Sequence, residues 1–384
     1  MNAAAVSVAE GVSYTPTALF VTWPDGNRAE FPSVWLRDNR ASDRDPNSGQ
    51  RLVDVADLPP DPRIRHVVPD GRSLLVEWEG EGAPARFDLE WLRENSEHAR
   101  LPPELRVRTW LNGAGLDARR DFAWAAEGEL RSDERVRLAW VTRLAQDGIA
   151  FLSGVPSREL AILEAVTPLG FVIDTNYGRV FDVRSVPQPE NLAYSDLGLG
   201  LHTDNPYRDP VPGFQALHCL QASREGGESL FADGFAIAAH LRESQPAAFE
   251  LLTRTPVPFR YRSKDAELYS ERPLIQLSSR GEVRAVHYNN RSIAPLRLSP
   301  GATTAFYGAY RVFALALREP RFQVHSRLGD GDLVVFDNQR VLHGRTSFSS
   351  ARYGRHLQGC YLTRDSVLSG AGVLRRKLGE GEKA

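Results

Sequence analysis

The residues with the clearest chemical potential are an imidazole and a carboxylate two positions apart, His202 and Asp204. They follow a Gly-Leu-Gly-Leu run at residues 198–201, which is typical of the approach to a strand. Residues i and i+2 of a strand point to the same face, so we expect the two side chains to converge on one point. A second histidine, His343, comes after the apolar run 333–336. Two histidines and one carboxylate predict a non-haem Fe(II) centre with open coordination positions.

An anion site is predicted next to this centre. Arg355 lies twelve residues after His343, and its guanidinium is suited to hold the far carboxylate of 2-oxoglutarate in a bidentate contact. A His-x-Asp pair alone arises often by chance, and an aspartate cap beside a packed histidine is the alternative explanation. The complete set of two histidines, one aspartate and one arginine is much more specific, and it favours an iron oxygenase.

With these residues the chain resembles the Fe(II)/2-oxoglutarate dioxygenases of the taurine dioxygenase and γ-butyrobetaine dioxygenase type, over about residues 21–376. The resemblance implies an enzyme with Fe(II) as its cofactor, 2-oxoglutarate and O2 as cosubstrates, and ascorbate as a helpful reductant. It also implies that Leu217 and Ser229 assist in binding 2-oxoglutarate. The expected assembly is a homodimer.

The composition limits the other partners. The chain has 47 basic and 49 acidic residues among 384, and this balance does not suggest a nucleic-acid partner. Two cysteines, Cys219 and Cys360, are expected to be buried free thiols. We find no apolar run of membrane-spanning length and no signal-peptide pattern, so we expect no membrane partner and a cytoplasmic protein.

A repeated pattern predicts a small β-rich domain at the N-terminus. Each copy reads as strand, turn, strand and a short Trp-Leu-Arg segment, at residues 35–37 in the first copy and 91–93 in the second. We therefore divide the chain into a loose leader, the β-rich domain, a Pro-containing linker, the catalytic domain and a tail, at residues 1–14, 15–100, 101–122, 123–376 and 377–384.

The resemblance raises the question of zinc in this first domain. In γ-butyrobetaine dioxygenases a cysteine cluster follows the first Trp-Leu-Arg segment and binds zinc with a later histidine. The matching positions here are Arg40, Ser42 and Asp45, none of which supplies a thiolate, and His66 is left without partners. Structural zinc needs four good ligands, so we predict that this protein binds no zinc.

The catalytic domain is expected to be mainly β with flanking helices. Short strands separated by Gly and Pro indicate a double-sheet jelly roll, and the resemblance implies the double-stranded β-helix. The residue patterns predict helices at about 133–147, 158–166 and 235–252, and strands at 148–152, 214–220 and 230–234.

The resemblance also implies an aromatic cage for a trimethylammonium group. Four aromatic residues match the cage positions of γ-butyrobetaine dioxygenases: Tyr177, Phe181, Tyr194 and Tyr361. A quaternary ammonium cannot donate hydrogen bonds, and each ring face contributes about 0.5–2 kcal/mol to its binding. Ordinary core packing is the alternative explanation for these residues.

The residues expected at the anionic end of the substrate differ from those of the carnitine-forming enzymes. Asn191 and Asn289 match residues that bind the substrate carboxylate in the carnitine-forming enzymes. Asn205, Asn290 and Arg291 add an arginine and further amides, which suit a group with more oxygens and charge. A surface or structural ion pair is the alternative role for Arg291.

On this basis the sequence is most like 2-(trimethylammonio)ethylphosphonate dioxygenases. The predicted reaction is hydroxylation of that compound at the carbon next to phosphorus, giving the 1-hydroxy product, succinate and CO2. γ-Butyrobetaine hydroxylation to L-carnitine is the alternative, since the carbon hydroxylated is again the second from nitrogen. A non-catalytic protein that binds a quaternary amine is a more remote alternative.

Overall fold

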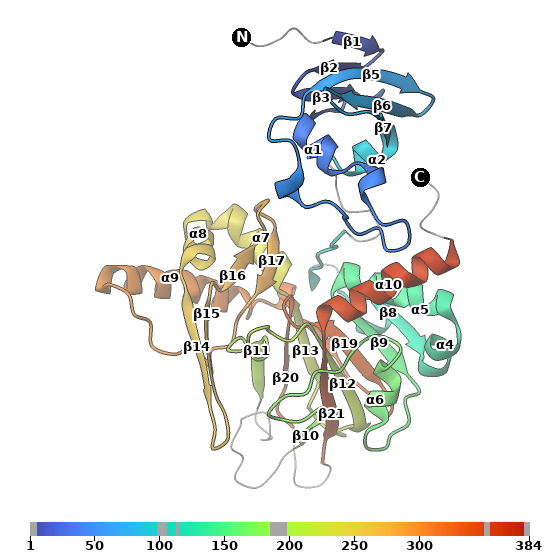
Figure 1. The fold of residues 1–384 in the computed structure, drawn as a ribbon. Coiled ribbons are helices and arrows are strands. Elements are labelled where there is room, and N and C mark those ends of the chain that lie inside the picture. Colours follow the sequence, from blue (N-terminus) through green and yellow to red (C-terminus); the bar gives the residue numbers. More distant parts are fainter. Residues whose placement is uncertain (1–5, 98–105, 113–114, 185–197, 349–353, 380–384) are drawn as a thin grey trace. The chain divides into compact units, whose positions relative to one another are not determined.

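The computed structural model describes residues 6–97, 106–112, 115–184, 198–348 and 354–379 (Figure 1). The chain divides into two compact units, residues 1–102 and 103–383. Asn191 and Tyr194, predicted to bind substrate, lie outside the described residues.

The first unit contains two antiparallel sheets, each followed by a short helix. The first sheet and its helix are β1 (Val6–Ala9), β2 (Val12–Thr15), β3 (Ala18–Thr22), β4 (Arg28–Pro32) and α1 (Ser33–Asp38). The second sheet and its helix are β5 (Ile64–Asp70), β6 (Ser73–Trp78), β7 (Ala85–Asp88) and α2 (Leu89–Glu94). The expected repeat is confirmed as strand, strand and helix in each half. The prediction of a loose leader at residues 1–14 is wrong from residue 6 onward, because β1 and β2 pair there as a hairpin.

An ion-pair network stands at the position where zinc was considered. Arg37 and Arg40 each pair with both Asp43 and Glu81, and the N···O distances lie between 2.5 and 2.8 Å. The network joins the segment after α1 to the turn after β6. Charge pairs therefore link two parts of this unit that are about forty residues apart in sequence.

The second unit is built on two sheets that face each other. The larger sheet has the strand order β10-β21-β12-β19-β9-β8, and the smaller has β11-β20-β13-β18. Phe151 on β9 and Phe231 on β13 meet edge to face with ring centroids 6.2 Å apart, which places an apolar core between the sheets. This is the expected jelly roll. The strands are β8 (Ala123–Ala126), β9 (Ile149–Ser153), β10 (Phe181–Arg184), β11 (Leu199–His202), β12 (Phe214–Gln221), β13 (Ser229–Asp233), β18 (Val324–Ser326), β19 (Leu333–Asp337), β20 (Val341–Arg345) and β21 (His356–Leu362).

Helices flank the two sheets (Figure 1). Beside the larger sheet lie α4 (Glu127–Ser132), α5 (Glu134–Asp147), α6 (Ala161–Val166) and α10 (Arg364–Leu378). Beside the smaller sheet lie α7 (Gly234–Ser244), α8 (Pro246–Arg254), α9 (Pro300–Ala316) and the hairpins β14–β15 (Val257–Arg262, Glu267–Arg272) and β16–β17 (Ile275–Leu277, Val283–Val286). Among the described residues, no helix is long and apolar enough to cross a membrane.

Local signals explain where these helices begin and end. The side chain of Asp133 caps α5 by accepting from the backbone N–H groups of Arg135 and Val136, and Gly148 ends the helix at φ 75°. The predicted helix at 158–166 begins later, at Ala161, because Leu160 adopts a left-handed conformation with φ 63°. The predicted helix at 235–252 is two helices, because Pro246 lacks the N–H that a continuous helix needs.

The expected linker is partly wrong, because residues 106–122 belong to the second unit. The backbone N–H of Trp110 donates to Asp233 over 3.1 Å, and its ring N–H donates to the carbonyl of Asp147 over 2.8 Å. The fully buried Arg340 pairs with Asp233 at 2.8 Å and also donates to the carbonyl of Arg108. The segment also contains α3 (Ala118–Asp121). A segment held by buried hydrogen bonds does not act as a flexible spacer.

Candidate active site

The three predicted metal ligands meet at one end of the smaller sheet. His202 ends β11 and lies opposite His343 on the antiparallel strand β20, with ring centroids 4.4 Å apart. The sequence predicted that Asp204 would lie on the same strand as His202. In the structure it lies in the bend that follows β11. The backbone of Asp204 is held there by Asn338, whose side chain accepts from its N–H at 2.7 Å and donates to its carbonyl at 3.0 Å. Sequence reasoning had not assigned Asn338 a role.

The geometry of this group fits a metal ion. The His202 Nε2–Asp204 Oδ1 distance is 3.2 Å and the His343 Nε2–Asp204 Oδ2 distance is 3.6 Å. All three ligand atoms lie within 4.8 Å of one another, and this is the group that can hold a metal in the part of the chain that the structure describes. Ligands around a metal with bonds of about 2.1 Å lie about 3 Å apart, so a small adjustment would complete the site.

The protonation states also suit metal binding. His202 Nδ1 lies 2.9 Å from the carbonyl oxygen of Gly200, and donation to this oxygen leaves Nε2 free to bind a metal. Burial lowers the pKa of His202 to about 4, so the ring is neutral at pH 7. Burial alone would raise the pKa of Asp204, but hydrogen bonds with His202 and His343 hold it well below its usual value.

Two buried arginines line the cavity that contains these ligands. Arg355 lines the same cavity, as predicted, and so does Arg345, which sequence reasoning missed. Burial, and then the charge of Arg345, lower the pKa of Arg355 to about 10, so the guanidinium of Arg355 remains charged at pH 7. The available signal for Arg345 was its position two residues after His343 on one strand, which places both on the same face. Two cations in a buried cavity favour a bound anion such as 2-oxoglutarate.

The ligands and the two arginines open into one cavity of about 420 Å³. Of the described residues predicted to bind the cosubstrate or substrate, all but one line it: Leu217, Ser229, Arg355, Tyr177, Phe181, Tyr361, Asn205, Asn289 and Arg291. Residues that were not predicted also line it, among them Tyr207, Gln215, Tyr261 and Arg345. The cavity therefore joins the metal ligands to aromatic, amide and guanidinium groups.

Among the predicted substrate-binding residues that the structure describes, Asn290 is the one whose prediction is wrong. It is exposed and does not line the cavity. The side chain of Asn289 faces inward and donates to the carbonyl of Thr203 at 3.0 Å. Asn290 begins a turn in which the backbone N–H of Ser292 donates to the carbonyl of Asn289 at 3.1 Å, and this turn leaves the Asn290 side chain at the surface.

The three predicted cage aromatics that the structure describes line the same cavity as the metal ligands. Phe181 and Tyr361 have ring centroids 5.1 Å apart, and the Tyr361 hydroxyl donates to Asp204 Oδ2 at 2.9 Å. Burial, and then the nearby Asp204 carboxylate, raise the pKa of Tyr361 well above its usual value. Tyr361 therefore keeps its proton, orients the carboxylate and presents its ring beside the metal site.

Asn205 and Arg291 place donors on the same cavity. Asn205 is a non-glycine residue with φ 54°, a conformation that asparagine tolerates better than most residues. Its Oδ1 accepts from the Tyr207 hydroxyl at 2.6 Å, and its buried Nδ2 has no partner among the described residues. Arg291 lines the cavity although the residue is exposed to solvent at the surface, and no ion pair of its side chain is found among the residues that the structure describes.

Comparison with known proteins identifies the family. The model of the taurine catabolism dioxygenase TauD, TfdA family matches residues 114–361, and the model of the γ-butyrobetaine hydroxylase-like N-terminal domain matches residues 12–93. The chain belongs to the TauD/TfdA dioxygenase family.

Three relatives of this dioxygenase align along most of its length. A γ-butyrobetaine dioxygenase of Pseudomonas sp. (strain AK-1) is 37% identical over 382 residues, covering 97% of this chain and 96% of the relative. Dioxygenase str8 of Strobilurus tenacellus is 32% identical and covers 90% and 85%, and the human γ-butyrobetaine dioxygenase is 29% identical and covers 94% and 95%.

The family and the geometry together define the enzyme class. This chain is an Fe(II)/2-oxoglutarate-dependent dioxygenase that uses O2. The residues that fit Fe(II) are His202, Asp204 and His343, whose two imidazoles and one carboxylate suit a non-haem iron site. A purely non-catalytic binding protein, considered from sequence, does not agree with this class.

Proposed function

We propose that this dioxygenase hydroxylates γ-butyrobetaine and forms L-carnitine, succinate and CO2. The observation that carries the proposal is the cavity, in which aromatic rings and anion-binding donors both lie beside the metal ligands. Two of the full-length relatives described above are γ-butyrobetaine dioxygenases, and one of them shares 37% identity.

The cation of the substrate is assigned to the rings of Tyr177, Phe181 and Tyr361. A trimethylammonium group has no N–H, so it gains most from ring faces in a partly desolvated site. Because Tyr361 also donates to Asp204, the ring that contacts the cation is fixed relative to the metal ligand. The substrate carbon two bonds from nitrogen would then lie near the metal.

The anion of the substrate is assigned to Asn205, Asn289 and Arg291. The Nδ2 group of Asn205 is a buried donor without a described partner, and Arg291 supplies a guanidinium fork. Burying an unpaired donor costs about 1–3 kcal/mol, so an incoming anion that accepts from Nδ2 recovers this energy.

The protein's own groups position the reactants. Arg355 and Arg345 would hold the dianionic cosubstrate, and His202, Asp204 and His343 would hold the metal ion beside it. Bound Fe(II) supplies the activation of O2 and the oxidative decarboxylation of 2-oxoglutarate. The two apolar rings of Phe181 and Phe231 in the cavity wall help to exclude water from the site.

2-(Trimethylammonio)ethylphosphonate, the first choice from sequence, is the second candidate. Arg291 and the unpaired Nδ2 of Asn205 favour it, because a phosphonate has three oxygens to satisfy. The outward position of Asn290 removes one of the three donors on which that choice depended. The relatives favour the carboxylate substrate.

A competition between the two substrates tests the proposal. The enzyme with Fe(II), ascorbate and 2-oxoglutarate should give the higher kcat/KM with γ-butyrobetaine, with L-carnitine identified by mass spectrometry. A higher kcat/KM with the phosphonate would replace the proposal by the second candidate. Turnover of neither compound would reject a trimethylammonium substrate of this length.

We also propose that the chain acts as a homodimer in the cytoplasm and that residues 15–100 serve dimerisation or scaffolding, as the resemblance implies. Light scattering coupled to size-exclusion chromatography tests the first point, because a monomer mass of 42.7 kDa in solution would contradict it. Deletion of residues 1–102 tests the second, since it should change the measured mass if this unit forms the dimer.

A further inference from the structure

The hairpin β14–β15 forms part of the cavity wall, and none of the site residues predicted from sequence lies on it. It forms a separate two-stranded sheet, outside the two sheets of the jelly roll (Figure 1). Three consecutive residues of β14 line the cavity: Arg260, Tyr261 and Arg262. Both arginines pair with Glu267 on β15, so part of their charge is neutralised within the hairpin.

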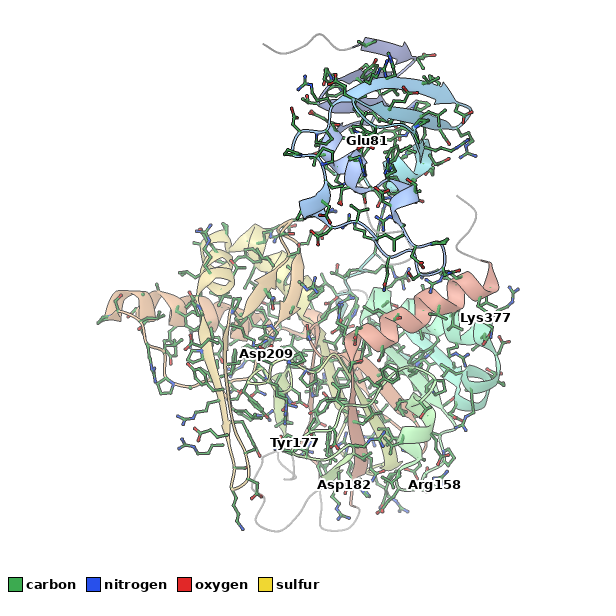
Figure 2. All side chains as sticks on the ribbon, viewed as in Figure 1. Glu81, Arg158, Tyr177, Asp182, Asp209 and Lys377 are labelled. Carbon is green, nitrogen blue, oxygen red and sulfur yellow. The ribbon has the colours of Figure 1, made fainter. Side chains whose placement is uncertain are left out.

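Tyr261 meets two other tyrosines that also line the cavity. Its ring stacks on that of Tyr207, with centroids 5.2 Å apart and an interplanar angle of 22°. It meets Tyr177 at 5.7 Å and 65°, an edge-to-face arrangement. Figure 2 shows Tyr177 beside this hairpin, which agrees with the ring contact.

These two neighbours belong to, or contact, the two sets of residues to which the ends of the substrate are assigned. Tyr177 is one of the rings assigned to the cation. Tyr207 donates from its hydroxyl to Oδ1 of Asn205, which is assigned to the anion, and this hydroxyl also lies 3.2 Å from that of Tyr177. Burial raises the pKa of Tyr207 to about 12, so its hydroxyl keeps the proton that it donates. Tyr261 thus touches both the group that fixes the cation end and the group that fixes the anion end.

We propose that Tyr261 is a positioning residue that selects the substrate by length. Its ring holds Tyr177 and Tyr207 at a fixed separation, and this separation sets the distance between the cation and the anion that the cavity accepts. The inference rests on the proposed function, because it requires a substrate with a trimethylammonium group at one end and an anion at the other.

The hairpin offers a matched control for this residue. Tyr269 is a tyrosine on β15 that pairs in register with Arg260. It is 51% exposed and does not line the cavity. Its hydroxyl donates to Glu271 on the same strand. Truncation of Tyr269 removes a ring from the same hairpin without touching Tyr177 or Tyr207.

The test compares trimethylammonium carboxylates that differ by single methylene groups, from three to five carbons in the acid chain. Tyr261→Ala should reduce kcat/KM for γ-butyrobetaine about tenfold, mainly through KM, and should narrow its preference over the three- and five-carbon homologues. The variant should also form more succinate per hydroxylated product, because a loosely held substrate misses the reaction geometry. Tyr261→Phe keeps the ring and should retain the preference for γ-butyrobetaine over its homologues, whereas Tyr269→Ala should behave as the wild type.

The outcomes separate this inference from the proposed function. If the wild type turns over γ-butyrobetaine but Tyr261→Ala lowers kcat/KM for all homologues by the same factor, the inference is wrong and the proposed function stands. If the wild type turns over no homologue, the proposed function fails and the inference fails with it. Tyr261→Leu keeps apolar volume in case the alanine variant unfolds, and an unchanged length preference in this folded variant would also overturn the inference.

Discussion

Gly359 offers a sharp way to test whether Phe181 binds the substrate. A Cβ atom at Gly359 on β21 would lie 2.4 and 2.5 Å from two ring atoms of Phe181, and 3.0 Å from a methyl group of Leu217. Carbon atoms in contact are about 3.5–4.0 Å apart, so Gly359→Ala must displace the Phe181 ring by about 1 Å. The glycine is therefore required here by the space that the aromatic ring occupies over β21.

The expected effect follows from the loss of one well-placed ring. A cation–π contact contributes about 0.5–2 kcal/mol, which corresponds to a rise of roughly 2- to 30-fold in the substrate KM. Overpacking also lowers the free energy of unfolding by about 1–3 kcal/mol. Initial rates of succinate formation over a range of substrate concentrations measure the first quantity, and urea unfolding measures the second.

A double-mutant cycle tells the ring's contribution apart from general damage. In the Phe181→Ala background the added methyl group meets no ring, so Gly359→Ala should change KM little further. If Gly359→Ala raises KM by the same factor in both backgrounds, the effect does not act through Phe181, and the assignment of this ring to the substrate is refuted.

Four further predictions concern metal, ion pairs and pH. His202→Ala should abolish Fe(II) binding and turnover with the fold intact by circular dichroism, and near-normal activity with added iron would contradict the assigned site. Elemental analysis of the untagged protein should find no stoichiometric zinc, whereas one zinc per chain would show that the first unit was misread. Arg340→Ala should lower the free energy of unfolding by about 3–5 kcal/mol, because it leaves the buried Asp233 charge unpaired; a urea-unfolding difference below 1 kcal/mol would contradict this. Burial lowers the pKa of His287 to about 3, so the unfolded chain binds the additional proton and stability should fall as the pH drops below about 6.5; His287→Gln should flatten that fall in unfolding curves measured between pH 7 and 5.

Much of the site could be predicted because coordination chemistry restricts residue types. An iron site needs imidazoles and a carboxylate, and His202, Asp204 and His343 are recognisable by type and spacing before any fold is known. The helix at 134–147 and the strand at 149–153 were also predictable, since their apolar spacing and the flanking Asp133 and Gly148 act over a few residues.

Local spacing did not determine which way a side chain points once the chain bends. Asp204 reaches the metal site from a bend fixed by Asn338, which is 134 residues away, rather than from the strand itself. Asn290 was chosen with its neighbours for its amide, yet it is exposed, because it begins the turn that follows the inward-facing Asn289. These orientations depend on hydrogen bonds between distant segments, which no pattern within a few residues records.

The walls of the cavity were likewise decided by tertiary structure. Tyr207 and Tyr261 are 54 residues apart and look like ordinary aromatics in sequence, and their rings meet because hairpin β14–β15 folds back beside the cavity. Arg345 ends β20 of the smaller sheet, whereas Arg355 directly precedes β21 of the larger sheet, and both line the cavity. The sequence by itself determined the chemistry, because metal and anion ligands must be particular residue types; the tertiary structure decided the substrate site, because contacts between remote strands set the distance between its groups.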